Sequence, residues 1–218
     1  MSGFWDINGI SPENMNRLGP LVDGIVGTNG QYQDLYEAMV DPAGPLWTKV
    51  IVCAGCTMSQ DVLLGAAYQS GCIVSLGQLV EIGRKKLTID CDDFIMRNVA
   101  LRSATGDGLV LSEDRTMLDG VSILYSGGYG IKIESAGGGG YHKIINSVVY
   151  DNGDDGIEIA NGMSVYIAGT KIQANAGYGI DDNNASTTAV QMLGNLVTGN
   201  TLGQIDSVST LIAANRTA

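Results

Sequence analysis

The sequence is poor in proline, phenylalanine and basic residues. Its 218 residues include 4 Pro and 2 Phe against 31 Gly, and 12 Lys or Arg against 23 Asp or Glu. Abundant glycine without proline is typical of repeated tight or left-handed turns more than of disorder. Because 44% of the residues are apolar, mainly Val, Ile, Leu and Ala, we expect short strands between these turns and a packed core.

The shortage of basic charge and of long apolar runs argues against two classes of partner. A formal charge of −11 opposes contact with nucleic-acid phosphates, so we expect no nucleic-acid partner. No segment approaches about 18 uninterrupted apolar residues, and the first six residues lack a basic region followed by an apolar run. We therefore expect neither a membrane span nor a secretory signal.

Cysteine is scarce, and its spacing leaves three interpretations open. Cys53 and Cys56 form a C-x-x-C pair, whereas Cys72 and Cys91 are far apart in the sequence. A zinc site usually shows a second close pair, and a thioredoxin-like site needs a helix that starts at the first pair. We favour the third interpretation, in which the cysteines are buried free thiols that pack as small apolar residues.

A repeat begins near residue 106, in which glycine precedes a short strand with an apolar residue at every second position. Successive glycines lie 22, 26 and 23 residues apart, and a weaker copy starts at Gly203. The copies are Gly108-Leu109-Val110-Leu111, Gly130-Ile131-Lys132-Ile133, Gly156-Ile157-Glu158-Ile159 and Gly179-Ile180-Asp181-Asp182.

A second strand recurs half a period later, as in residues 117–121 and 144–148, and turn residues such as Asp151-Asn152-Gly153 lie between the strands. A unit of this length cannot bury its apolar face alone, so the units must stack. Stacking pairs each strand with its counterpart in the next unit and produces long parallel sheets. Weaker strands at 72–75, 79–82, 87–91 and 94–101 extend the pattern toward the N-terminus. We therefore predict an all-β, single-stranded parallel β-helix of about six coils over residues 49–218.

The first third of the chain lacks this repeat. Residues 32–40 place Leu35, Ala38 and Met39 on one helical face, which predicts a short helix that caps the stack within residues 31–48. Residues 1–30 have no strand period and look like an irregular arm. Its apolar side chains require burial, either against the chain's own helix or on a partner, and the residues we expect to dock are Phe4, Trp5, Ile7 and Ile10.

The helix Asp34-Leu35-Tyr36-Glu37-Ala38, followed by a Val-rich strand and by turns such as residues 151–157, resembles the pectin-lyase-like superfamily. It resembles in particular the short β-helices of bacteriophage tailspikes and of capsid cement, or decoration, proteins. The resemblance covers roughly residues 31–218 and implies a right-handed coil. For the viral members it also implies a side-by-side homotrimer.

Polysaccharide-cleaving members of this superfamily use carboxylates on the outside of one sheet, so the acidic pairs are candidate sites. Asp154-Asp155 resembles the paired aspartates of polygalacturonases. The other residues of that pattern are missing, because Lys132-Ile133-Glu134 lies one coil upstream and the only histidine, His142, precedes the pair. Asp and Asn also favour tight turns, which is the simpler interpretation of this pair.

Three weaker candidates remain. Asp181-Asp182 lies one coil beyond Asp154-Asp155, so the pairs could approach each other and bind Ca²⁺, although we assign neither a metal nor a cofactor. A lone histidine such as His142 is more often solvated or hydrogen-bonded than catalytic. Tyr129 and Tyr178 precede equivalent glycines and could form a surface ladder of rings.

The function that these observations favour is that of a nonenzymatic virion protein. We expect a homotrimeric decoration protein on the surface of a phage capsid, whose arm contacts the major capsid protein. The main alternative is a tailspike-type or secreted polysaccharide depolymerase, either a lyase or a glycoside hydrolase, with Asp154 and Asp155 as catalytic residues. A noncatalytic glycan-binding adhesin is the third hypothesis.

Overall fold

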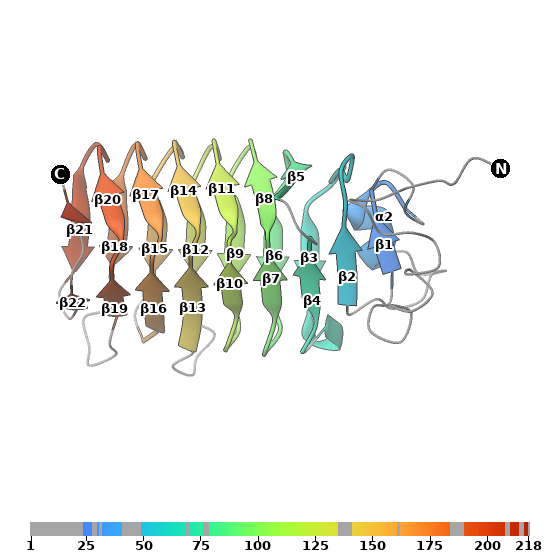
Figure 1. The fold of residues 1–218 in the computed structure, drawn as a ribbon, viewed down its shortest axis with the longest axis horizontal. Helices are drawn as coiled ribbons and strands as arrows, with labels where there is room; N and C mark the ends of the chain where they lie inside the picture. The colour runs from blue at the N-terminus through green and yellow to red at the C-terminus, as the bar shows by residue number, and fades with distance from the viewer. Residues whose placement is uncertain are drawn as a thin grey trace.

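The computed structural model describes residues 24–27, 30, 32–40, 49–68, 70–75, 79–134, 141–160, 162–183, 190–207, 210–213 and 216–217. These residues form a parallel β-solenoid of about six turns with very little helix. The strands of successive turns lie side by side along one axis (Figure 1). The predicted all-β parallel coil is confirmed. No helix among these residues is long and apolar enough to span a membrane.

From β4 to β21, each turn contributes one strand to each of three parallel sheets. Sheet 1 has nine strands: β1 (Gly24–Val26), β2 (Lys49–Val52), β4 (Cys72–Val74), β7 (Ile95–Arg97), β10 (Met117–Asp119), β13 (Tyr141–Ile145), β16 (Ser164–Ala168), β19 (Val190–Leu193) and β22 (Thr210–Ala213). Sheet 2 has seven: β5 (Val80–Gly83), β8 (Val99–Arg102), β11 (Ser122–Leu124), β14 (Val148–Tyr150), β17 (Lys171–Gln173), β20 (Leu196–Thr198) and β23 (Arg216–Thr217). Sheet 3 also has seven: β3 (Val62–Leu64), β6 (Leu87–Ile89), β9 (Leu109–Leu111), β12 (Ile131–Ile133), β15 (Ile157–Ile159), β18 (Tyr178–Asp182) and β21 (Gly203–Ser207).

The glycine-led repeat corresponds to sheet 3, and its pairing follows the spacing in the sequence. Leu109 pairs with Ile131, Ile131 with Ile157, and Ile157 with Ile180. Alternate residues of these strands point inward, so β12 and β15 bury their two isoleucines while Lys132 and Glu158 stay partly exposed. The inward residues form one core cluster that extends from Val26 to Val197.

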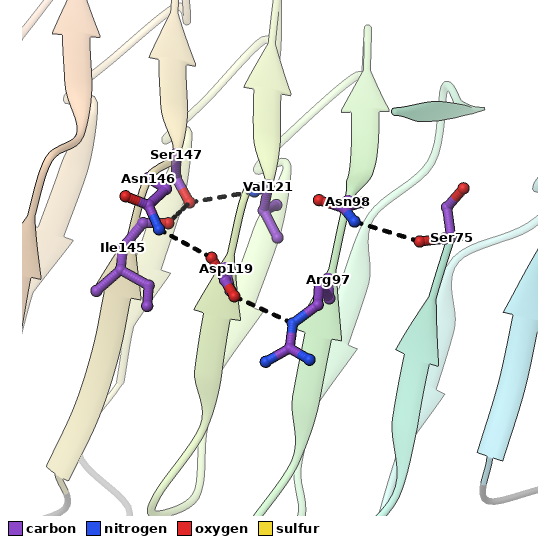
Figure 2. Close-up of polar contacts among 8 residues, drawn as sticks. All are labelled: Ser75, Arg97, Asn98, Asp119, Val121, Ile145, Asn146 and Ser147. Atoms are coloured by element: carbon purple, nitrogen blue, oxygen red, sulfur yellow. Dashed lines mark hydrogen bonds and ion pairs between the residues drawn. The ribbon is translucent and has the colours of Figure 1, made fainter. Parts of the chain in front are cut away.

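At the first corner, between sheets 1 and 2, the chain bends through a residue with positive φ. Asn98 and Asn146 have φ values of 55° and 52° there, and glycine occupies the corner in the other turns from β10 to β20. Figure 2 shows how polar groups join neighbouring turns at this corner. Asp119 accepts hydrogen bonds from the Arg97 guanidinium at 3.0 Å and from the Asn146 amide at 3.1 Å. These exposed contacts link three successive turns.

The second corner, between sheets 2 and 3, contains a column of buried asparagines. The backbone N–H of Asn152 donates to the side-chain oxygen of Asn175 at 3.1 Å, and that of Asn175 donates to Asn200 at 3.0 Å. The side-chain amides of Asn152 and Asn175 donate to the next asparagine at 2.8 Å. Since an unpaired buried N–H is costly, this column satisfies the backbone where the chain leaves the sheet pattern.

A short helix lies beside the N-terminal end of the solenoid, as predicted. Helix α2 (Leu35–Val40) buries Leu35, Ala38 and Met39. Asp34 caps it, because one of its carboxylate oxygens accepts hydrogen bonds from the backbone N–H groups of Tyr36 and Glu37. A second short helix, η1 (Ala66–Tyr68), follows β3.

Two details differ from the sequence interpretation. Residues 94–101, 117–121 and 144–148 were each expected to form one strand, but each segment crosses the first corner, where Asn98, Gly120 and Asn146 have positive φ. In addition, β1 lies within the segment expected to be an arm and pairs with β2, so the strand at residue 49 is not the first of its sheet. Phe4, Trp5, Ile7 and Ile10 lie outside the described residues.

None of the four cysteines forms a disulfide, and three of them, Cys53, Cys56 and Cys91, are buried. Burial is the main reason that the pKa values of Cys56 and Cys91 rise to about 12, so both are neutral thiols at ordinary pH. This arrangement agrees with the interpretation of the cysteines as packing residues, although Cys72 is partly exposed.

Candidate functional site: a carboxylate cluster on sheet 3

The outward face of sheet 3 carries a row of charged residues over its last four turns. Lys132 pairs in register with Glu158, Glu158 with Asp181, and Asp181 with Asp206. Strands of adjacent turns are about 4.8 Å apart, so neighbouring side chains of this row are within contact distance of each other. The row therefore gathers three carboxylates and one ammonium group from residues that are distant in the sequence.

A fourth carboxylate, from Asp155, joins the row at the second corner. Asp155 lies between Tyr129 and Tyr178, because the N–H of Gly130 donates to the Asp155 carbonyl and that of Gly156 donates to the Tyr178 carbonyl. The backbone N–H of Tyr178 also donates to the Asp155 carboxylate at 2.5 Å. The suggested ladder of tyrosines is thus interrupted by a buried aspartate.

Asp155, Glu158 and Asp181 form the cluster at the centre of this surface. Each offers a carboxylate oxygen, and these oxygens all lie within 4.8 Å of one another. One oxygen of Glu158 accepts a hydrogen bond from the Asn183 amide at 2.6 Å. The other, Oε2, is buried and has no hydrogen-bond partner among the described residues. An ionised carboxylate in that position would be poorly stabilised.

Burial and mutual repulsion raise the pKa of every member of the cluster. The pKa of Glu158 rises to about 7, chiefly through burial and then through the negative charge of Asp181. Burial likewise raises the pKa of Asp155 and of Asp181. Carboxyl groups this close titrate as a coupled set, so the cluster retains a proton near neutral pH while part of it is ionised.

Two further polar groups flank the cluster one turn upstream. The ammonium group of Lys132 forms an ion pair with Glu134 at 2.9 Å and lies 5.8 Å from the centroid of the Tyr129 ring. Burial, followed by the charges of Asp154 and Glu158, raises the pKa of Tyr129. A proton-bearing carboxyl, ionised carboxylates, a phenol and an ammonium group therefore share one lateral surface, and such a set can perform acid–base chemistry.

The structure brings together one residue from each of the acidic pairs predicted from the sequence. Asp155 and Asp181 meet, whereas Asp154 is exposed outside the cluster and Asp182 is buried at the inward position that Ile159 occupies one turn earlier. The sequence interpretation missed Glu158. Aligning Gly156 with Gly179 would have found it, because that register sets Glu158 beside Asp181.

The cluster could also hold a hard cation. Ca²⁺ takes about 6–8 oxygen ligands, so three carboxylates would supply part of its coordination and water the remainder. Because Glu158 holds a proton near neutral pH, a cation would have to displace that proton, and its affinity would rise with pH.

His142, the only histidine, lies away from this surface. Its side chain is fully buried in the core, and neither ring nitrogen has a hydrogen-bond partner among the described residues. The expectation that it is solvated or hydrogen-bonded was wrong. Burial lowers its pKa to about 4, so the ring is neutral at ordinary pH.

The fold and the comparisons agree on the class of protein. The family model for a right-handed β-helix region matches residues 87–216, and the chain belongs to this family. Among solved structures, the A-module of the mannuronan C-5 epimerase AlgE6 from Azotobacter vinelandii matches with a TM-score of 0.50 and 15% sequence identity. The match covers 81% of this chain and 66% of that module, slightly less than two thirds of its length. At this identity the likeness concerns the fold alone. No curated protein matches the chain significantly.

Proposed function

We propose that this chain is a polysaccharide-cleaving enzyme, a depolymerase, with Glu158 as its proton-carrying group. The observation that carries the proposal is the convergence of Asp155, Glu158 and Asp181, whose oxygens lie within 4.8 Å of one another while Glu158 keeps its proton near neutral pH. Cleavage of a glycosidic bond needs one carboxylic acid that protonates the leaving oxygen and one ionised carboxylate. This cluster offers both.

The surroundings of the cluster suit a polymer substrate. The cluster lies on the lateral face of a coil whose turns repeat along one axis, so an extended chain can run across several turns. Tyr129 and Tyr178 flank Asp155 and can contact sugar rings. The structurally similar epimerase takes its name from mannuronan, which is also a polysaccharide.

The distance between the carboxylate oxygens indicates which type of glycoside hydrolysis the cluster fits. Two carboxyl groups that invert the anomeric centre directly are roughly 6.5–9.5 Å apart, which leaves room for water, whereas a double displacement uses about 5–5.5 Å. Oxygens within 4.8 Å of one another fit the second case better. In that case Glu158 donates its proton to the leaving oxygen while Asp181 attacks the sugar carbon, and water later releases the sugar from Asp181.

The test is a cleavage assay on a panel of neutral and acidic polysaccharides. New reducing ends report hydrolysis, and absorbance of unsaturated ends reports elimination. We expect Glu158→Gln to lower the rate at least 100-fold, in the range of effects that general acids have. Glu37→Gln, on the exposed side of α2, is the matched control and should keep wild-type activity. Equal rates for the wild type and Glu158→Gln would refute the proposal, as would the absence of cleavage across the panel.

A second candidate function is the trimeric decoration protein on a phage capsid. The observation that favours it is a set of three exposed apolar side chains, at different register positions, on the outer face of sheet 1. Ile95 and Leu193 are 37% and 46% exposed there, and Tyr141 is 45% exposed. Such a face could pack against copies of itself. Light scattering of the purified chain tests this candidate, since a mass of three chains that persists on dilution supports the trimer and a monomer contradicts it.

A further inference from the structure

The strongest unassigned feature is a basic pocket at the N-terminal end of sheet 2. An open cavity of about 360 Å³ is lined by Glu81, Gly83, Arg84, Arg102 and Ser103. Two of these residues are cationic and one is anionic, in a chain whose formal charge is −11. Lys85 and Lys86 directly follow Arg84, so four of the twelve basic residues lie at or beside this pocket.

The two arginines of the pocket differ in how they are held. Arg102 donates to Glu81 at 3.0 Å, and its guanidinium lies 5.0 Å from the centroid of the Tyr125 ring. These contacts fix its orientation and leave other guanidinium N–H groups for a ligand. Arg84 is exposed, and its guanidinium has no ion-pair partner among the described residues. Since Glu81 offsets only one of these charges, the pocket has an unbalanced positive charge.

An aromatic pair continues from the pocket along the same edge of the solenoid. Tyr125 is 41% exposed, and its ring stands at 87° to that of Tyr150, with their centroids 5.7 Å apart. Sheet 2 runs in the order β5, β8, β11, β14, so this edge spans about 14 Å at the usual strand spacing. Tyr150 immediately precedes the second-corner segment that leads to Asp155. The basic pocket, the tyrosine pair and the carboxylate cluster therefore follow one another along the second corner.

We propose that this pocket binds an anionic group of a sugar chain, with Arg84 and Arg102 holding a carboxylate or a sulfate ester and Tyr125 and Tyr150 contacting the adjoining sugar rings. Guanidinium groups pair with planar or tetrahedral oxyanions through several N–H donors, and tyrosine supplies the apolar contact that a sugar ring needs. That the ligand is a polysaccharide rests on the proposed function. That the ligand is anionic rests on the two arginines of the pocket and not on the proposed function.

Binding by calorimetry at low salt tests this assignment on the full chain. The probes are oligogalacturonate for carboxylates, a heparin oligosaccharide for sulfates and a malto-oligosaccharide as the neutral counterpart. We expect at least one anionic probe to bind more than tenfold more tightly than the neutral probe. Arg84→Gln/Arg102→Gln should weaken that binding at least tenfold, and Tyr125→Ala should weaken it severalfold.

The matched control removes the same charge elsewhere. Lys171→Gln/Arg216→Gln changes two exposed basic residues at the other end of sheet 2 and should alter affinity less than twofold. Three results would overturn the proposal: no binding of either anionic probe, equal affinity for the neutral probe, or equal losses in both double variants. If no polysaccharide is cleaved but Arg84→Gln/Arg102→Gln still loses binding, the proposed enzymatic function fails while this site stands.

Discussion

Glycine at the start of the sheet 3 strands occupies a position where no side chain fits. A Cβ on Gly156 would lie 2.6 Å from the carbonyl oxygen of Gly179 and 2.7 Å from the amide nitrogen of Asn175. Gly130 and Gly179 show the same crowding against Asn152 and Asn200. The periodic glycine therefore permits the close approach of successive turns beside the asparagine column.

We predict that Gly156→Ala destabilises the fold by about 3 kcal/mol, because the methyl group must push apart two backbones. Gly106→Ala is the control, since a Cβ there meets nothing within 4 Å. Urea unfolding of both variants measures the difference. Similar midpoints for the two would contradict the crowding argument.

The raised pKa that suits Glu158 to proton transfer also makes its ionised form destabilising. Its folded pKa of about 7 exceeds the ordinary value of 4.5, so the folded state holds the proton more tightly than the unfolded state. The stability that this proton supplies is complete below pH 4.5 and is lost as the pH rises through 7.

We predict that Glu158→Gln, which stays neutral, unfolds like the wild type at pH 4 but is more stable at pH 8. The gain should be about 1 kcal/mol, a figure that allows for solvent screening of a partly exposed group. Thermal unfolding at the two pH values provides the measurement. A variant that is less stable than the wild type at pH 8 would show that Glu158 is not strained there.

His142 has the opposite sign of pH dependence. Its folded pKa of about 4 lies below the ordinary value of 6.5, so the stability linked to the neutral ring is present above pH 6.5 and is lost as the pH falls through 4. We predict that His142→Val, which copies the residue at the same register in β16, removes this pH-dependent contribution to stability. The difference in unfolding free energy between the variant and the wild type should therefore shift in favour of the variant from pH 7 to pH 4. A constant difference would argue against a buried neutral ring.

Hydrogen bonds at the corners keep the strands of successive turns in register. In the second corner, the Asn175 side chain accepts two hydrogen bonds from Asn152 and donates one to Asn200. We predict that Asn175→Ala costs about 3 kcal/mol, because it leaves buried donors of Asn152 without an acceptor. Gln173→Ala, two residues earlier on β17, is the control and should cost less than about 1 kcal/mol. Denaturant unfolding checks both values.

Register and the turn at residues 151–153 of the second corner could be predicted from the sequence, but the positions of the first corner could not. The spacing of Gly108, Gly130, Gly156 and Gly179 gave the correct pairing of four strands because an inward isoleucine or leucine flanks each outward residue. The strand expected at residues 94–101 was too long, since the left-handed backbone of Asn98 has no apolar signature. Asparagine in that position was the available signal.

At the scale of the whole molecule, the solenoid converts sequence separations of about one turn into neighbouring side chains. Glu158 and Asp181 lie 23 residues apart in the sequence, yet they are direct register partners. The repeat thus contained enough information to find the acidic row. The repeat alone could not predict that Glu158 Oε2 is buried or that the pKa of Glu158 is raised. Both depend on how Asp155 and Asn183 pack around this side chain.

The arrangement also separates charge along the second corner. The basic pocket lies near the N-terminal turns and the carboxylate cluster near the C-terminal turns, with tyrosines between them. An anionic polymer would be attracted at one end and meet acid–base groups at the other. This polarity gives the proposed enzyme a defined direction for its substrate.

The most direct test of the central claim is the pKa of Glu158, measured by carbon-detected NMR titration of the side-chain carboxyl groups in the full chain. Asp155→Asn and Asp181→Asn serve to assign the coupling within the cluster. We predict that Glu158 titrates near 7 in the wild type and that its pKa falls when Asp181 is neutralised. A Glu158 pKa close to the ordinary value of 4.5 that does not respond to Asp181→Asn would contradict the carboxylate centre on which the proposed function depends.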